Sequence, residues 1–77
     1  MNPPQTPKEW LLYALSVYKI GILADRDPFF EVGKGYTIEI ERNGVFKLLS
    51  EGTVVAPFRD LDELCIFILN TPDTNVG

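Results

Sequence analysis

YTIEIERNGVFKLLSEGTVVAPF, residues 36–58, is the stretch of this sequence that decides the predicted fold. Its apolar runs are interrupted twice, by Arg42-Asn43-Gly44 and by Ser50-Glu51-Gly52, and such polar, glycine-containing triplets are typical of tight turns. Between the triplets, apolar and polar side chains largely alternate, as they do in strands with one buried face. The stretch therefore predicts a three-stranded antiparallel meander.

The first turn of the meander has a preferred length. A two-residue Asn43-Gly44 turn would set Ile40 opposite Lys47 and mix apolar with polar side chains on each face. A three-residue loop with Gly44 in the left-handed conformation sets Ile40 opposite Phe46 and keeps the faces separate. We expect the same construction at Ser50-Glu51-Gly52. The predicted core face then consists of Ile38, Ile40, Phe46, Leu48, Val54, Ala56 and Phe58.

The opposite face of the meander mixes charged and apolar side chains. It consists of Thr37, Glu39, Glu41, Val45, Lys47, Leu49, Thr53, Val55 and Pro57. Val45, Leu49 and Val55 interrupt the charges, which is unusual for a face that meets only water. The carboxylates of Glu39 and Glu41 lie beside Lys47, so we expect a cross-strand salt bridge there and not an acid–base pair in a cleft.

A long apolar helix is predicted before the meander. Thr6-Pro7-Lys8-Glu9 has the pattern of a capping box with proline in the first turn, and Asp25-Arg26-Asp27-Pro28 is expected to end the helix after Trp10–Ala24. Leu12 and Leu23 interrupt its polar face. The segment is shorter than the roughly 20 apolar residues that a bilayer requires, so its surplus apolar surface should meet protein.

A second helix is predicted after the meander. Asp60 is placed to cap it with Glu63 at the third helical position, and the helix should extend to about Asn70. The β-favouring letters LCIFIL leave a strand as the alternative. The predicted fold is α+β in two layers, in the order helix, three-stranded antiparallel meander, helix. The simplest arrangement has both helices on one face of the sheet, but the order of the elements does not decide this.

The segment between the first helix and the meander carries weaker signals. Phe29–Val32 should be extended, and Gly33-Lys34-Gly35 should form a loop or a bulge. The glycines of this tripeptide lack the spacing of a phosphate-binding loop, and no helix is expected to follow them.

Length and composition indicate one small domain. A chain of 77 residues buries only about 60% of its unfolded surface and cannot supply two cores. We expect residues 1–77 to form a single domain with an ordered core over about 6–70 and frayed termini at 1–5 and 71–77. One cysteine and a start without the pattern of a signal peptide indicate a reducing, cytoplasmic setting.

The charge of the chain disfavours nucleic acid as the main ligand. The net charge is −4, and phosphate binding relies on Lys and Arg. Residues 1–28 hold three basic and three acidic side chains, whereas residues 29–77 hold four basic and eight acidic ones. This asymmetry is mild evidence for a basic partner.

The sequence offers little catalytic chemistry. It contains no histidine, which is the commonest general base and metal ligand, and one cysteine cannot form a familiar zinc site. Cys65 lies between Leu64 and Ile66 and should be an inert core thiol. We therefore expect no catalytic residues, no metal, no cofactor and no enzymatic activity.

Two families share part of the predicted pattern. The order helix, three strands, helix resembles that of double-stranded-RNA-binding domains, but their second helix begins with lysines where this chain has Asp60-Leu61-Asp62-Glu63. YTIEIERNGVFKLL followed by FRDLDELCIFI is similar in outline to the distal half of Src-homology 2 domains, where a hairpin precedes an F-x-x-L-x-x-L helix. The arginine-bearing strand of a phosphotyrosine pocket is missing, so no residue role is carried over from either family.

The function that these features favour is a small cytoplasmic protein-interaction module of the adaptor or inhibitor type. Its partner would be another protein or a second copy of the chain in a homodimer, with no membrane and no nucleic acid expected. The candidate surface combines an apolar part with an acidic rim and consists of Trp10, Leu12, Tyr13, Leu23, Val45, Leu49, Val55, Glu39, Glu41 and Asp62.

Two alternatives to this function stay open. The first is nucleic-acid binding by analogy of topology, through Lys34, Arg42, Lys47 and Arg59. The second is an acidic mimic of nucleic acid that blocks a basic partner, and it would use Glu39, Glu41, Asp60, Asp62 and Glu63.

Overall fold

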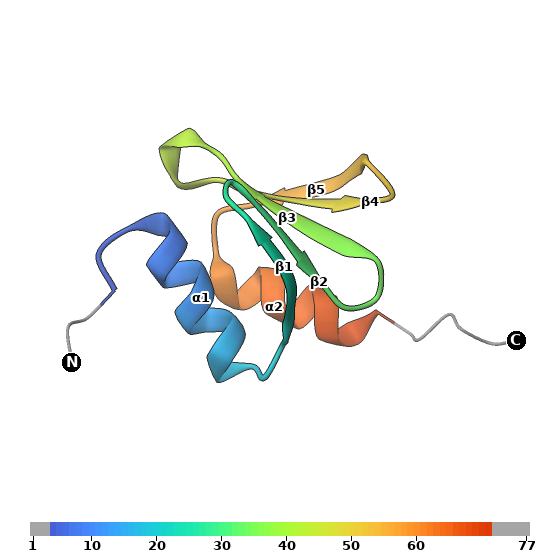
Figure 1. Cartoon of the computed structure of the whole chain (residues 1–77), viewed down its shortest axis with the longest axis horizontal. Coiled ribbons are helices and arrows are strands. Elements are labelled where there is room, and N and C mark those ends of the chain that lie inside the picture. Colours follow the sequence, from blue (N-terminus) through green and yellow to red (C-terminus); the bar gives the residue numbers. More distant parts are fainter. Residues whose placement is uncertain (1–3, 72–77) are drawn as a thin grey trace, which may run out of the picture.

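The computed structural model describes residues 4–71 and consists of two helices and a five-stranded antiparallel sheet (Figure 1). The elements are α1 (Pro7–Val17), β1 (Ile22–Arg26), β2 (Phe29–Val32), β3 (Tyr36–Ile40), the 3-10 turn η1 (Arg42–Gly44), β4 (Phe46–Ser50), β5 (Thr53–Phe58) and α2 (Leu61–Asn70). The strands pair in sequence order, β1-β2-β3-β4-β5. The α+β class is confirmed, but the three-stranded description is wrong because two further strands precede the meander.

Helix α1 begins as predicted and ends earlier than predicted. The Thr6 hydroxyl accepts the N–H of Glu9 at 3.1 Å, and the Glu9 carboxylate accepts the N–H of Thr6 at 3.2 Å, so the capping box is confirmed. The helix stops at Val17 and does not continue to Ala24.

The early end of α1 has a local cause. Lys19 takes a left-handed conformation with φ 59°, its N–H donates to Ser16 O, and the N–H of Ile20 donates to Leu15 O. These two bonds form a Schellman motif, which normally has glycine at the left-handed position. The helix end was missed because lysine occupies that position here.

Strand β1 takes up the residues that had been assigned to the end of the first helix. Arg26 pairs with Phe29, so Asp27-Pro28 forms the turn between β1 and β2 where the sequence predicted a helix stop. Leu23 is the extra residue of an irregularity between Ile22 and Ala24, and its side chain is 72% exposed. Its predicted place on the surface of the first helix is therefore wrong.

The hairpin between β3 and β4 follows the predicted register. Ile40 lies opposite Phe46, Ile38 opposite Leu48 and Glu39 opposite Lys47. The N–H of Glu41 donates to Val45 O at 2.8 Å, which closes the three-residue loop. Gly44 has φ 73°, as expected, and Asn43 is also left-handed with φ 68°.

The hairpin between β4 and β5 is built differently from the prediction. Ser50 pairs with Thr53, so the turn consists of Glu51 and Gly52 alone, both with positive φ. The shorter turn would put the wrong side chains inward, and a bulge after Leu48 corrects this. Ala56 and Phe58 therefore share the face of Leu48 and Phe46 as predicted, whereas Val54 pairs with Leu49 and is 49% exposed. The prediction of Val54 in the core is wrong.

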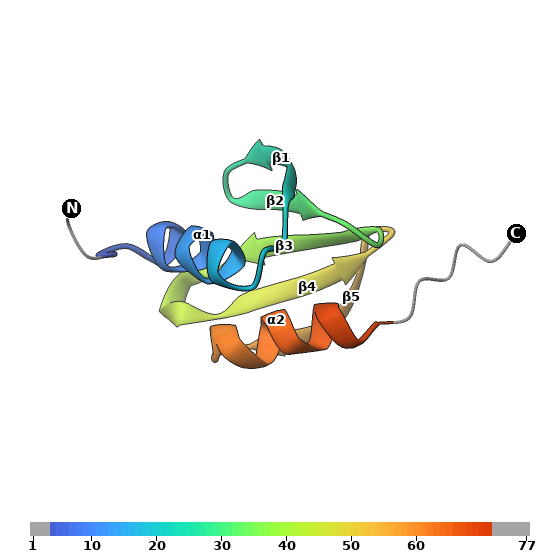
Figure 2. The same cartoon turned by 90° about the horizontal axis from the view of Figure 1, so that it is seen from below.

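Both helices pack on one face of the sheet, which the sequence had left open, and α2 lies alongside β4 and β5 (Figure 2). One cluster of buried side chains joins the helices to the central strands. It consists of Leu11, Ala14, Leu15, Phe30, Val32, Tyr36, Ile38, Phe46, Leu48, Leu64, Cys65 and Ile68. The other side of the sheet, here called the outer face, is covered by no described element.

Helix α2 replaces the alternative strand and is held at both ends. The Asp60 carboxylate accepts the N–H of Asp62 at 2.8 Å at its start. At its end the ammonium group of Lys34 donates to Ile68 O, Leu69 O and Thr71 O, at 3.2, 3.3 and 2.6 Å. The tripeptide Gly33-Lys34-Gly35, predicted as a loop, is the turn between β2 and β3, and its lysine caps α2.

The termini predicted to fray lie mostly outside the described residues, at 1–3 and 72–77. Within the described range the N–H of Gln5 donates to the Glu9 carboxylate at 2.9 Å, and the hydroxyls of Tyr36 and Thr71 are hydrogen-bonded at 2.9 Å. Over residues 4–71 no helix combines the length and the apolar character needed to cross a membrane.

Candidate functional site

An apolar stripe on the outer side of α1 is exposed. Trp10, Tyr13 and Val17 are spaced three and four residues apart and are 47%, 55% and 57% exposed. The opposite stripe of the helix is buried in the core, and Leu12 packs against that core from the side. Of the predicted helix surface, Trp10 and Tyr13 therefore stay together, while Leu12 turns inward.

Two adjoining hollows lie between this stripe and the start of α2. The wide hollow has a volume of about 550 Å³ and is lined by Pro7, Trp10, Phe46, Arg59, Asp60 and Leu61 among others. The acidic hollow has a volume of about 270 Å³ and is lined by Trp10, Tyr13, Val17, Tyr18, Asp60 and Asp62 among others. Because they share Trp10, Asp60 and Leu61, we call them together the interhelical groove.

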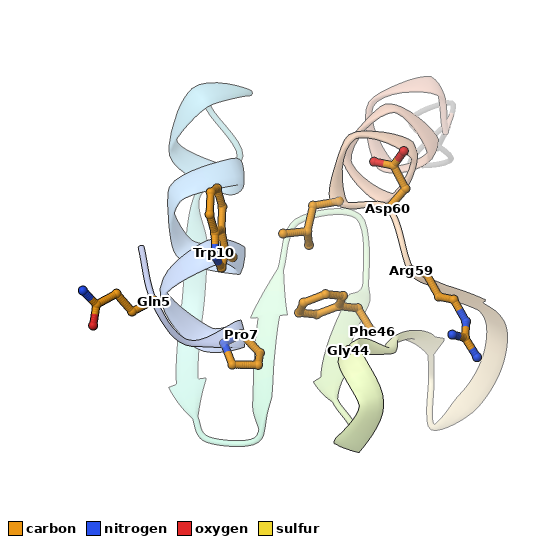
Figure 3. Close-up of a pocket in the computed structure, with 8 residues that line it drawn as sticks. Gln5, Pro7, Trp10, Gly44, Phe46, Arg59 and Asp60 are labelled. Carbon is orange, nitrogen blue, oxygen red and sulfur yellow. The ribbon is translucent and has the colours of Figure 1, made fainter. Parts of the chain in front are cut away.

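Figure 3 shows the wide hollow in detail. Trp10 lies on the α1 side and Asp60 on the side of α2, with Phe46 between them at the base. Phe46 is 5% exposed and also belongs to the core, so the floor of the groove is continuous with the packed interior. This half of the groove is apolar below and polar at the rim.

The carboxylates of the acidic hollow are fixed in place. The Tyr18 hydroxyl donates to Asp62 Oδ1 at 3.0 Å, and Asp60 accepts the N–H of Asp62. The hydrogen bond to Asp62, followed by burial and by the charges of Asp62, Cys65 and Asp60, raises the pKa of Tyr18 above its ordinary value of 10.0. The phenol therefore remains a neutral donor at physiological pH.

The two carboxylates have no ion-pair partner among residues 4–71. The salt bridges in this part of the chain join Lys8 to Asp25 at 3.9 Å and Lys47 to Glu41 at 3.2 Å. No lysine or arginine lines the acidic hollow. A concave, partly aromatic surface thus carries two carboxylates without an ion-pair partner among residues 4–71, and Arg59 lines the wide hollow together with Asp60.

The single thiol of the chain is buried in the core, as predicted. Cys65 is buried, and burial, followed by the charge of Asp62, raises its pKa from 9.0 to about 11. A thiol with this pKa is protonated at neutral pH and is a poor nucleophile. Over residues 4–71 no group of three or more His, Cys, Asp or Glu side chains is arranged to hold a metal ion.

The outer face of the sheet is the second exposed apolar surface. Phe29, Val54 and Val55 are 42%, 49% and 43% exposed, while the predicted residues Val45 and Leu49 are half-buried. Glu39 lies opposite Lys47, and the salt bridge of Lys47 is made with Glu41. A hollow of about 170 Å³ on this face is lined by Arg26 and Glu31, whose charges are opposite. Of the charged side chains of this face, Lys47 and Glu41 form an ion pair.

The two edges of the sheet are poorly suited to pairing with another strand. The edge strand β1 is irregular between Ile22 and Ala24. The other edge strand, β5, pairs with β4 through a bulge and contains Pro57, which has no N–H. Bulges and proline are common devices that prevent edge-to-edge association. The exposed apolar surfaces thus include the interhelical groove and the outer face, besides Ile66, Phe67 and Leu69 of α2, which are 46%, 39% and 47% exposed.

A comparison of the chain with protein-family models, with curated proteins and with solved structures gives no match. The interpretation of the surface therefore depends on the residues and their geometry.

Several residues of the groove were missed from the sequence. Val17 and Tyr18 had been placed inside a longer helix, although Val17 continues the spacing of Trp10 and Tyr13 and could have been found from it. Phe46 and Leu61 had been treated only as parts of the core and of a helix start. Their approach to Trp10 depends on packing between distant segments, for which the sequence carries no local signal.

Proposed function

We propose that the chain is a small, non-catalytic, cytoplasmic protein-interaction module of the adaptor or inhibitor type, which binds another protein in the interhelical groove. The observation that carries this proposal is the exposed stripe of Trp10, Tyr13 and Val17 beside a hollow with two carboxylates that form no ion pair within residues 4–71. Aromatic anchors in a concave, desolvated setting supply most of the binding energy in many protein interfaces.

The geometry of the groove supports docking by an apolar side chain. Phe46 lies at the base of the wide hollow, and the ring of Trp10 provides a wall. Leu61, which packs against the core, adds to the apolar lining. Trp10 and Tyr13 are held edge to face, with ring centroids 6.2 Å apart and planes at 87°. Such a pair is already ordered, so little side-chain entropy is lost when a partner covers it.

The available chemistry supports a binding role over catalysis. The chain has no histidine, and its single thiol is buried with a raised pKa. The tyrosine hydroxyl of the acidic hollow has a raised pKa as well, so it is no better a base or nucleophile than an ordinary phenol.

The distribution of carboxylates disfavours the acidic-mimic alternative. Glu39 and Glu41 lie on the outer face of the sheet, whereas Asp60, Asp62 and Glu63 lie at the start of α2, beyond the opposite face. A mimic of a phosphate backbone needs its charges along one surface. The same separation applies to the cations of the nucleic-acid alternative, since Lys34 caps α2 and Lys47 pairs with Glu41.

The proposal is tested with a partner purified after capture from the native host. Trp10→Ala should weaken binding by about 2 kcal/mol, or roughly 30-fold, because the main wall of the groove is removed. The matched control is Val55→Ala, which truncates a similarly exposed side chain on the outer face. An affinity that falls with Val55→Ala and not with Trp10→Ala would reject the groove as the docking site.

A second candidate function is self-association through the outer face. It is favoured by the exposure of Phe29, Val54 and Val55 on a sheet face that no described element covers. Two sheets packed face to face would bury these side chains against each other. In that case the wild type should sediment as a dimer and Val55→Glu as a folded monomer. Equal masses for the two proteins would exclude this candidate.

A further inference from the structure

The acidic hollow has the chemistry of a site for a cation. Its lining combines Trp10, Tyr13 and Tyr18 with the carboxylates of Asp60 and Asp62, and it contains no basic side chain. Aromatic faces attract ammonium and guanidinium groups within about 6 Å of the ring centre, and carboxylates pair with them directly. We propose that the acidic hollow binds a lysine or arginine side chain of a partner peptide, a proposal that rests on the proposed function of the groove.

The aromatic rings are available to such a ligand. The edge-to-face contact of Trp10 and Tyr13 uses the edge of one ring and one face of the other, and the side chains remain 47% and 55% exposed. Both side chains therefore line the hollow with about half of their surface exposed. Lys8, two residues before Trp10, lies 3.9 Å from Asp25 and 5.7 Å from the ring centre of Phe30, and it does not line the hollow.

The carboxylates keep the capacity to bind. Asp62 uses Oδ1 to accept the Tyr18 hydroxyl, and Asp60 uses Oδ1 to accept the N–H of Asp62. Each carboxylate accepts several hydrogen bonds when ionised, so each retains free lone pairs. The N-terminus of α2 offsets about half of one charge, and the two carboxylates together leave a clear negative excess.

The adjoining wide hollow indicates which side chain of the partner should lie next to the lysine or arginine. Its apolar lining, which includes Trp10, Phe46 and Leu61, suits an apolar side chain. Arg59, at the rim of this hollow, would repel a second cation there. The partner segment therefore has an apolar side chain next to a lysine or arginine, and an acidic segment is rejected by Asp60 and Asp62.

The test uses a pair of blocked hexapeptides that differ in one group. One contains Leu-Arg between alanines, and the other has citrulline, a neutral isostere, in place of arginine. Binding is followed by amide and indole N–H shifts of the isotope-labelled protein, in which Trp10 is the one tryptophan of the chain. We expect the arginine peptide to shift the Trp10 indole and to bind roughly tenfold more tightly than the citrulline peptide at low salt.

A matched pair of variants links the preference to the hollow. Asp62→Asn should remove most of the difference between the peptides, whereas Glu63→Gln, which removes the same charge one residue away, should retain it because Glu63 does not line the hollow. Equal affinity of the two peptides would overturn the cation site and leave the apolar docking function intact. Binding of neither peptide would also overturn it, while the Trp10→Ala test with the purified partner would judge the proposed function separately.

A further outcome identifies a different occupant. If the same signals shift with protein concentration in the absence of peptide, a second copy of the chain occupies the groove, and the assignment to a basic peptide is overturned.

Discussion

The interhelical groove and the outer face of the sheet each have three large apolar side chains that are about half exposed, but the two surfaces differ in shape. The groove is concave, and two of its carboxylates lack an ion-pair partner among residues 4–71. On the outer face Lys47 pairs with Glu41, and Arg26 and Glu31 border the same small hollow. Exposed apolar area therefore does not identify a binding site by itself. A hollow with carboxylates that lack an ion pair offers a partner an apolar contact and also fixes how its charged groups are oriented.

The largest expected difference between the two surfaces is in stability. Phe46→Ala should lower the free energy of unfolding by about 3–5 kcal/mol, because Phe46 is 5% exposed and joins the floor of the groove to the core. Val54→Ala on the outer face should cost less than about 1 kcal/mol, since its side chain is half exposed. Urea unfolding measures both values. Equal losses would mean that the groove is not continuous with the core.

The second prediction concerns the stability of the protein at alkaline pH. The Cys65 pKa is raised from 9.0 to about 11 in the folded protein. Below pH 9 the thiol is protonated in both states and its contribution is complete. Between about pH 9 and 11 the unfolded chain releases the proton while the folded chain keeps it, so stability falls, by about 2 kcal/mol.

This loss is isolated by comparing variants. Unfolding free energies of wild type and Cys65→Ala, measured from pH 8 to 11, should converge as the pH rises. Tyr18→Phe is the control for the other raised pKa beside the groove, that of Tyr18. A constant gap between wild type and Cys65→Ala would show that the buried thiol does not couple folding to pH.

The third prediction concerns Lys34, whose effect on stability should exceed that of Lys47 on the outer face. Lys34→Met should lower stability by about 1 kcal/mol, because its ammonium group caps the three carbonyls at the end of α2. Hydrogen exchange in the last turn of α2 should speed up while the groove at the other end of the helix keeps its affinity for the partner. An unchanged exchange rate in that turn would argue against the cap.

The smallest effect is expected on the outer face. Lys47→Met removes the salt bridge to Glu41, whose two side chains are each about one third exposed, and should change stability by less than about 0.5 kcal/mol. Urea unfolding at low and high salt should give the same small value. A larger and salt-sensitive loss would show that the charges of this face contribute more than those at the end of α2.

The sequence predicts those parts of the fold that depend on nearby residues. The capping box of Thr6 and Glu9, the cap at Asp60 and the register of Ile40 opposite Phe46 are all found. Each follows from a short pattern in which the alternative leaves backbone groups unpaired or places apolar side chains in water.

The errors in the predicted fold arise where the backbone departs from the conformation that a residue type or a turn usually adopts. Lys19 takes a left-handed position that usually belongs to glycine, so the end of α1 was missed and β1 with it. The Glu51-Gly52 turn is compensated by a bulge in the β4–β5 register, and this combination reverses the expected side of Val54. The left-handed lysine and the bulge both depend on contacts with a neighbouring helix or strand, which the local sequence does not reveal.

The candidate site was predicted in part for the same reason. Trp10, Tyr13 and Asp62 were singled out for their type and charge, and all three line the acidic hollow. Trp10 and Leu61 are 51 positions apart in the sequence, and the groove exists because both helices pack on one face of the sheet. Leu23, chosen with them, lies in β1 and does not line the groove.

The central claim is that the groove, and not the outer face, meets the partner. It is tested by mapping amide and indole N–H shifts of the labelled protein on addition of the purified partner. We expect the largest changes at the Trp10 indole and at Tyr13, Leu61 and Asp62. Changes concentrated at Phe29, Leu49, Val54 and Val55, with the Trp10 indole unmoved, would contradict it.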